Sequence, residues 1–204
     1  DLGVNSFGLV IFTSIFFFSL VAIQMYNNFS ASTFPIPNSF IGYATKVVLI
    51  LEFAPTIISV ILAGKVGSYI ASSIGTMRVT EQIDALDIMG VNSPNFLILP
   101  KILASVIFNP LLIAISIVFG IWGGYLAGLA TGNWSKADYI TGIQMYMPHH
   151  FIWYALFKTA VFAFLIATIP AFFGYNVKGG SLEVSRASTQ AVVWTTVYII
   201  ITNL

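Results

Sequence analysis

The sequence contains no cysteine and very few charged residues. Without cysteine the chain has no disulfide bond, no thiol nucleophile and no thiolate ligand for a metal. Charged residues make up 7% of the chain, whereas a soluble domain carries about 25% because its surface faces water. Hydrophobic residues make up 58%. This composition excludes a soluble enzyme, a nucleic-acid-binding protein and a disordered chain, and it indicates a protein of the lipid bilayer.

Several catalytic motifs are also missing. We find no Walker A pattern, no G-x-S-x-G and no H-E-x-x-H. His149 and His150 are adjacent, so their side chains diverge on a helix or a strand and make a poor metal-binding pair. No metal site or bound cofactor is therefore expected, and any ATP would bind to another chain.

Long runs that are poor in charge divide the chain into candidate membrane spans. A bilayer core about 30 Å thick requires about 20 apolar residues in a helix. The runs are Phe7–Gln24, Tyr43–Ser73, Ile102–Ala130, Phe151–Phe173 and Ala191–Leu204. We predict an all-α bundle of about five spans that forms one membrane domain over residues 1–204. Because the chain begins with Asp1 and its last run is short, we expect it to be truncated at both ends.

The segments between these runs predict loops and an orientation. Asn27–Asn38 contains two prolines and reads as a loop, and Gly132–Pro148 contains Trp134, Tyr139 and Tyr146, which suit a membrane interface. Lys and Arg are more frequent in the breaks after the second and fourth runs than in the other two. The positive-inside rule then places those two breaks in the cytoplasm.

The segment Gly75–Gly90 is unusually rich in charge. On one continuous helix, Val79, Ile83, Leu86 and Met89 would form an apolar stripe, with a polar stripe made by Arg78, Glu81, Asp84 and Asp87. Gly90 suits the position after the helix, and Pro94 is expected to prevent a restart. We predict a short amphipathic helix on the cytoplasmic side. Its acidic polar face favours a protein partner with a basic groove over an interfacial helix on anionic lipid.

Small residues recur every four positions in two places. They are Ala63, Gly67, Ala71 and Gly75 in the second run, and Gly120, Gly124, Gly128 and Gly132 in the third. Such ridges let helix backbones approach closely in lipid. They predict helix packing, either within the bundle or between copies, rather than chemistry.

Glu52 and Lys158 are ionisable residues inside predicted spans, at similar depths below the outer surface. Each would cost at least about 2.5–3.5 kcal/mol if it faced lipid. We therefore expect them to face each other, a polar cavity or a partner subunit, as a structural ion pair or as the lining of a substrate route. Pro55 lies three residues after Glu52 and is expected to loosen the helix there.

The run Glu52–Gly90 resembles the MlaE family of ABC-transporter permeases, which are membrane subunits of MCE-type lipid transporters. The likeness continues through Pro100, Pro110–Leu112 and Gly120–Gly124, and it thins towards Gly174–Tyr175 and Ser185–Ala187. The resemblance covers most of the chain. One departure is Leu51, where the family often has Arg before the acidic residue, and this departure weakens any inference about headgroup charge.

The resemblance implies a homodimer in the bacterial inner membrane that moves glycerophospholipid. It also implies a P-loop ATPase that binds ATP and Mg, a periplasmic MCE-domain ring and, in some systems, a STAS-domain subunit. The Gly75–Gly90 segment resembles the coupling helix, with Arg78, Glu81, Asp84 and Asp87 as ATPase-docking residues. Glu52 and Lys158 match the family's intramembrane acidic and basic positions, which we place near the lipid headgroup. Together with Pro55 they are our candidate substrate-binding residues. Two alternatives are an ion-coupled secondary transporter that uses Glu52 and Lys158, and a lipid enzyme that uses Glu52 or the histidine pair.

Overall fold

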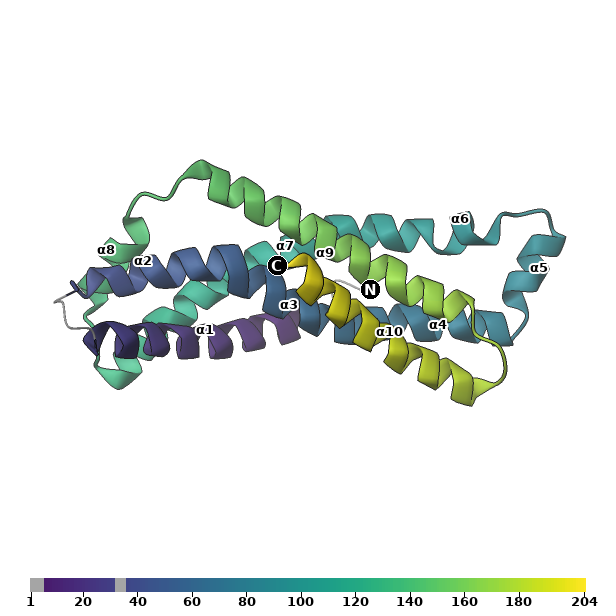
Figure 1. The fold of residues 1–204 in the computed structure, drawn as a ribbon, viewed down its shortest axis with the longest axis horizontal. Coiled ribbons are helices and arrows are strands. Elements are labelled where there is room, and N and C mark those ends of the chain that lie inside the picture. Colours follow the sequence, from purple (N-terminus) through teal and green to yellow (C-terminus); the bar gives the residue numbers. More distant parts are fainter. Residues whose placement is uncertain (1–5, 32–35) are drawn as a thin grey trace. The chain divides into compact units, whose positions relative to one another are not determined.

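A computed structural model describes residues 6–31 and 36–204, which contain helices but no strand (Figure 1). The predicted all-α class is confirmed. Two short segments, labelled η, are π-helical. The elements in chain order are α1 (Phe7–Ser30), α2 (Ser39–Val48), η2 (Leu49–Phe53), α3 (Ala54–Leu62), η3 (Ala63–Gly67), α4 (Ser68–Val79), α5 (Gln82–Ile88), α6 (Ser93–Leu97), α7 (Leu99–Thr131), α8 (Lys136–Gln144), α9 (His149–Tyr175) and α10 (Ser181–Thr202).

Four helical stretches of the described residues are long and apolar enough to cross a membrane. They are Phe7–Ser30, Ser39–Val79, Ser93–Thr131 and His149–Tyr175. Each contains one of the first four predicted runs. Most of the fifth run lies in α10, which begins at Ser181 rather than at Ala191 and ends at Thr202. This helix is not among the four stretches.

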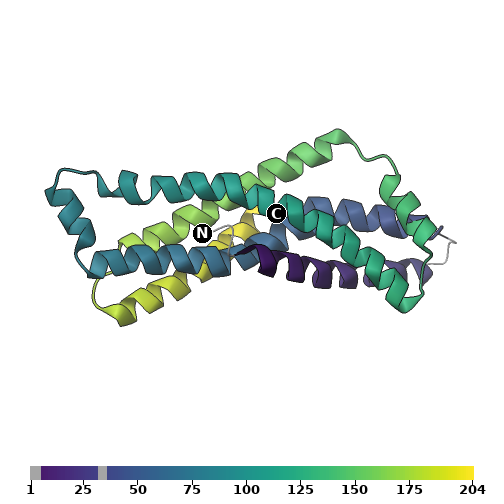
Figure 2. The ribbon, with the colours of Figure 1, turned by 180° about the vertical axis from the view of Figure 1, so that it is seen from behind.

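The helices belong to two compact units. Among the described residues, unit 1 comprises Ser6, 59–111 and 158–204, and unit 2 comprises 7–58 and 112–157. Helices α3, α7 and α9 contribute residues to both units. In unit 1, α4 packs against α10, while in unit 2, α2 packs against α1 and α8 (Figures 1 and 2). The prediction of a single membrane domain stays a prediction.

The segment Gly132–Pro148 of unit 2, predicted as a break with interfacial aromatic residues, is partly helical. The segment contains α8, whose first turn is capped by Ser135, since the backbone N–H of Asp138 donates to Ser135 Oγ at 3.1 Å. Trp134 and Tyr139 are buried within unit 2. The Tyr139 hydroxyl donates to the Ile121 carbonyl at 3.1 Å, and burial raises its pKa. Of the three aromatic residues, Tyr146 alone is exposed.

The two rings are buried because glycines on α7 leave room for them. A Cβ on Gly124 would overlap the Tyr139 hydroxyl, and a Cβ on Gly128 would overlap the Trp134 indole. Gly120 is similarly close to the Phe18 ring on α1. The two rings belong to a buried cluster of unit 2 that also contains Ala22, Ile41 and Ala127. This glycine ridge therefore receives aromatic side chains, not only a neighbouring backbone.

The small residues of unit 1 lie against α9, α10 and the linker between them. A Cβ on Gly67 would lie 3.1 Å from Pro170 Cγ, and one on Gly75 would lie 3.1 Å from Val184 Cγ1. In the reverse direction, a Cβ on Gly174 would lie 2.6 Å from the Ala71 carbonyl oxygen. Ala63 and Ala71 are fully buried. Close approach of this kind holds α4 beside the two later helices.

Candidate functional site

The charged segment between the second and third spans is not one helix. Helix α4 ends at Val79 and α5 begins at Gln82, with Glu81 between them at a φ of 60°. No other non-glycine residue that the structure describes has a positive φ. The Thr80 hydroxyl donates to the Thr76 carbonyl at 2.8 Å, which helps to end α4. The prediction of a continuous Gly75–Gly90 helix is therefore wrong, and its polar residues belong to two helices.

Arg78 braces the corner that this break creates. Its Nη1 donates to Asp84 Oδ1 at 2.7 Å, and its guanidinium carbon lies 5.8 Å from the centroid of the Tyr175 ring. The Tyr175 hydroxyl in turn lies 2.9 Å from Ser93 Oγ. These contacts connect the ends of α4, α5, α6 and α9 within unit 1. Sequence reasoning treated Arg78 as a docking residue and missed this internal brace, because Tyr175 is distant in the chain.

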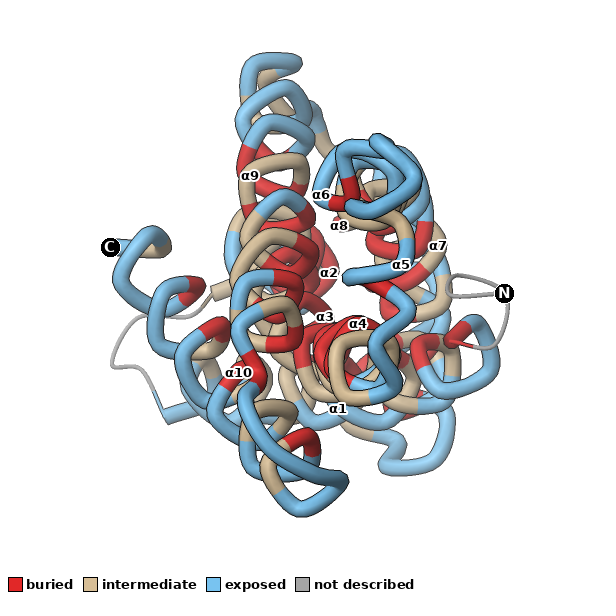
Figure 3. The backbone as a smooth tube through the Cα atoms, turned by 90° about the vertical axis from the view of Figure 1, so that its right-hand side faces the viewer, coloured by how far each residue is buried: buried red, intermediate tan, exposed pale blue. Residues whose placement is uncertain are grey.

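Helix α5 has one buried apolar side chain, and most of its other residues are exposed. Ile83 is fully buried, whereas Glu81, Asp84 and Asp87 are exposed. Met89, which was predicted on the apolar stripe, is 68% exposed, and the adjacent Ile88 is 87% exposed. The break at Glu81 rotates α5 relative to the predicted single helix, so the stripe is not continuous. Figure 3 shows most of α5 in the pale blue that marks exposed residues. The segment thus presents carboxylates beside exposed apolar side chains.

The end of α5 follows the prediction at Gly90 and departs from it at Pro94. Gly90 has a φ of 77°, its N–H donates to the Asp87 carbonyl, and the Val91 N–H donates to the Leu86 carbonyl, both at 3.0 Å. This pair of bonds is a Schellman motif. Pro94 does not prevent a restart, because it lies in the first turn of α6, where no N–H is needed.

Glu52 and Pro55 lie at a widened turn in unit 2. Glu52 belongs to π-helical η2, and the Ala54 N–H that follows this turn donates to the Leu49 carbonyl, five residues back. Pro55 lacks an N–H and its ring would crowd the carbonyl four residues earlier, so wider winding relieves the helix before it. Single-turn π-helices occur often at functional sites. The Glu52 side chain is exposed.

Lys158 lies in unit 1, on α9, and is buried together with Thr159. Glu52 belongs to unit 2, so the two residues lie in different units. Their predicted pairing stays a prediction. Apart from the presence of Pro55, no sequence signal indicated the π-helical winding around Glu52.

Buried polar side chains that sequence reasoning did not single out also lie inside the spans. Lys46 on α2 is 8% exposed and donates to the carbonyls of Ile143 at 2.8 Å and Met145 at 2.6 Å. In unit 1, Ser105 Oγ donates to the Ala163 carbonyl at 3.1 Å and receives the Asn109 amide at 2.8 Å. The burial of Lys46 could have been suspected from the sequence, because a lysine within an apolar run is unusual.

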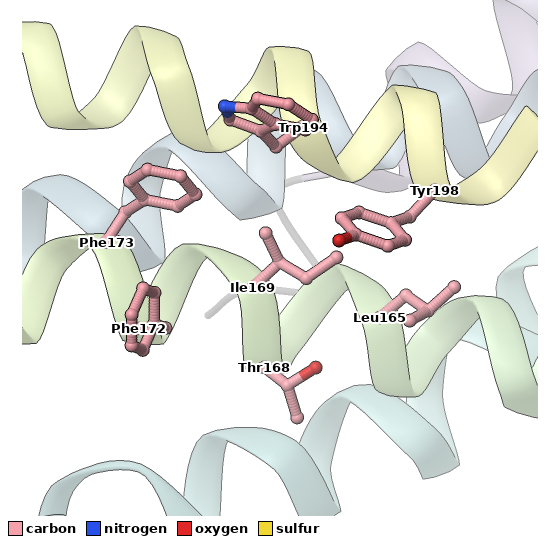
Figure 4. A pocket seen from close by; sticks show the side chains of 7 residues that line it. All are labelled: Leu165, Thr168, Ile169, Phe172, Phe173, Trp194 and Tyr198. Atoms are coloured by element: carbon pink, nitrogen blue, oxygen red, sulfur yellow. The ribbon is translucent and has the colours of Figure 1, made fainter.

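Unit 1 also carries an apolar groove between α9 and α10 (Figure 4). Its volume is about 500 Å³. Trp194 and Tyr198 on α10 face Leu165, Ile169 and Phe173 on α9. A second groove of about 490 Å³, between α4 and the first half of α10, is lined mainly by serine and threonine residues. The lining residues of both grooves belong to unit 1.

Comparison with known proteins identifies the family. A family model described as "Permease MlaE" matches residues 1–204. The chain belongs to the MlaE permease family. A "Probable ABC transporter permease protein" of Rickettsia bellii is 38% identical over 204 residues, which cover 99% of this chain and 77% of the relative. The "Intermembrane phospholipid transport system permease protein MlaE" of Haemophilus influenzae is 30% identical over 196 residues, covering 94% and 73%.

A more distant MlaE relative comes from a plant. The Arabidopsis thaliana protein named "TRIGALACTOSYLDIACYLGLYCEROL 1, chloroplastic" is 29% identical over 201 residues, covering 98% of this chain and 57% of the relative. Family membership and the four apolar helical stretches together make this chain a multi-pass membrane protein of the permease type.

Proposed function

We propose that this chain is the permease subunit of an ABC transporter that moves glycerophospholipids in the bacterial inner membrane. The permease works as a homodimer with a separate ATPase subunit that binds ATP and Mg, and it exchanges lipid with a periplasmic MCE-domain ring. A STAS-domain subunit joins the complex in some systems. Membership of the MlaE family and the printed name of the Haemophilus influenzae relative support the substrate class.

The exposed face of α5 supports ATPase docking. It presents Glu81, Asp84 and Asp87 beside Ile88 and Met89, all exposed. A protein interface commonly combines an apolar centre with a polar rim, and the carboxylates favour a partner of positive charge. Because Arg78 connects α5 to α4 and to Tyr175 on α9, a displacement of α5 is passed on to two spans. The coupling step in this proposal is that displacement.

Asp87 is the residue of choice for testing the coupling step. It is exposed and lies outside the brace, unlike Asp84. We expect D87K to weaken association with the ATPase subunit by about tenfold or more, through charge reversal at the contact, and to reduce ATP-dependent lipid transfer in proteoliposomes. D87N should give a smaller loss. Copurification of the ATPase and transfer of a labelled phospholipid are the two measurements.

Gln144→Lys on α8 is the matched control, because it changes the net charge by the same amount as D87N at an exposed position far from α5 in sequence. We expect it to leave ATPase association unchanged. Normal association and normal transfer in D87K would refute the coupling role of α5. Transfer driven by an ion gradient with no ATPase present would instead support the secondary-transporter alternative.

Glu52, Lys158 and Pro55 are proposed to line the lipid route. A charged side chain within the apolar region of a membrane is energetically costly, so such residues are rare and usually functional. The π-helical turn at Glu52 also supports a functional role. E52Q and K158M should lower lipid transfer several-fold while the ATPase subunit still copurifies. Unchanged transfer in both variants would contradict the assignment.

A further inference from the structure

A groove in unit 2 has the character of a lipid site. It lies between the second half of α7 and α8, and its volume is about 580 Å³, within the range of about 300–1,000 Å³ that is usual for ligand sites. Its lining is Val118, Phe119, Ile121, Trp122 and Tyr125 from α7, and Lys136, Tyr139, Ile140 and Ile143 from α8. Apart from Lys136, these side chains are apolar or aromatic.

The wall of the groove is preformed. The Tyr139 side chain is buried, its hydroxyl donates to the Ile121 carbonyl at 3.1 Å, and its ring stacks on Trp134 with centroids 6.2 Å apart. The outer lining is open, because Val118 is 65% exposed and Trp122 is 54% exposed. Large apolar side chains that are exposed on a membrane-spanning helix face acyl chains rather than water. The groove therefore offers a fixed apolar wall to lipid.

Lys136 supplies the single cation of the groove. Its Nζ lies 5.8 Å from the centroid of the Tyr125 ring. The nearby carboxylate of Asp138 accepts from the Ser135 hydroxyl at 2.7 Å and forms no ion pair with Lys136 in the part of the chain that is described. The ammonium group thus keeps hydrogen-bond donors available, which suits a phosphate oxygen.

The position of Lys136 along the chain is consistent with a place near the lipid headgroups. The span Ser93–Thr131 ends just before α8, so Lys136 follows the span directly, with Trp122 and Tyr125 in its last turns. Tryptophan, tyrosine and lysine are the residues that typically mark the headgroup level. The apolar lining from Val118 then extends from that level towards the bilayer centre.

From these observations we propose that the α7–α8 groove binds one anionic glycerophospholipid, with its phosphate on Lys136 and an acyl chain along Val118, Trp122 and Ile140. The occupant is a resident lipid of this chain. The inference does not rest on the proposed transport function, because it requires only a membrane-embedded chain, a charge and a groove. Its test measures lipid retention rather than transfer, so the two proposals fail separately.

The test uses the intact protein in nanodiscs of phosphatidylcholine with a minor fraction of phosphatidylglycerol, followed by native mass spectrometry. We expect the wild type to retain phosphatidylglycerol preferentially and K136Q to lose about fivefold in affinity for phosphatidylglycerol. The loss for phosphatidylcholine should be smaller, because its choline cation offsets the charge of its phosphate. I140W, which fills the groove at a partly exposed position, should reduce the retention of both lipids. The control is K178Q, at an exposed lysine of the α9–α10 linker, and should behave as the wild type.

Equal retention of phosphatidylglycerol by the wild type and K136Q would overturn the proposal. A photo-crosslinking residue at position 140 provides a second readout, since the proposal requires a lipid adduct. An adduct with a second copy of the chain or with another protein would also overturn it, because the groove would then be a protein interface.

Discussion

At the residue scale, Glu81 decides the shape of the acidic segment. A non-glycine residue in the left-handed region costs roughly 1–2 kcal/mol, so its φ of 60° is maintained by its surroundings. The anchor at Ile83, the Arg78–Asp84 ion pair and the Thr80 hydroxyl bond all hold the corner on either side of it. The ion pair is exposed and contributes little alone, so the corner depends chiefly on the burial of Ile83.

A substitution at Gly124 tests how closely α7 packs against the Tyr139 side chain. A methyl group there would overlap the buried Tyr139 hydroxyl, so we expect G124A to destabilise the protein by about 1–3 kcal/mol through overpacking. Thermal unfolding of the purified protein in detergent measures this loss. A methyl group on Gly8 of α1 would meet no other atom within 4 Å, so G8A should leave the melting temperature unchanged or slightly higher. Equal melting temperatures for G124A and G8A would contradict the packing argument.

At the scale of elements, unit 2 depends on a link between α2 and the segment after α8. Lys46 reaches across to the carbonyls of Ile143 and Met145, both of which lie where α8 ends and cannot bond within that helix. The lysine thus caps α8 from a neighbouring helix. Its burial is explained by this pair of acceptors and not by a role in substrate binding.

Removing the Lys46 ammonium should therefore loosen α8. We expect K46M to destabilise the protein by about 1–3 kcal/mol, since two carbonyls lose their donor, and to raise hydrogen exchange selectively in residues 136–145. Exchange measured by mass spectrometry, with K178M as the matched control at an exposed lysine, gives the comparison. Exchange raised evenly along the chain, or raised equally by K178M, would count against a local link.

At the scale of the whole molecule, the composition and the span pattern set the membrane topology. One span, Ser93–Thr131, separates α5 from α8, so the two short helices are predicted on opposite sides of the membrane. The coupling proposal requires α5 on the cytoplasmic side, where an ATPase would contact it, and the α7–α8 groove is then predicted at the outer headgroup level.

The lack of cysteine makes the topology directly measurable. In intact cells, a membrane-impermeant maleimide should label T141C on α8 and leave D87C unlabelled until the membrane is permeabilised. Both positions are exposed on this chain, so in cells that lack the proposed ATPase subunit their accessibility depends on the side of the membrane rather than on burial. Labelling of D87C from outside would contradict the orientation and the coupling role together.

Composition and periodicity alone determined the class of this protein, because apolar runs long enough to cross a bilayer must be helical to satisfy their backbone. They also placed the charged segment, the intramembrane residues and the stop at Gly90, since these depend on neighbours in the chain. Only the tertiary structure decided that Glu81 divides the segment, that Arg78 pairs with Asp84 and Tyr175, and that Trp134 and Tyr139 are buried against glycines. The contact of Arg78 with Tyr175 joins residues distant in sequence, where local pattern carries no information about the partner. The Arg78–Asp84 pair and the buried rings depend on how the chain turns between helices, at Glu81 and before α8.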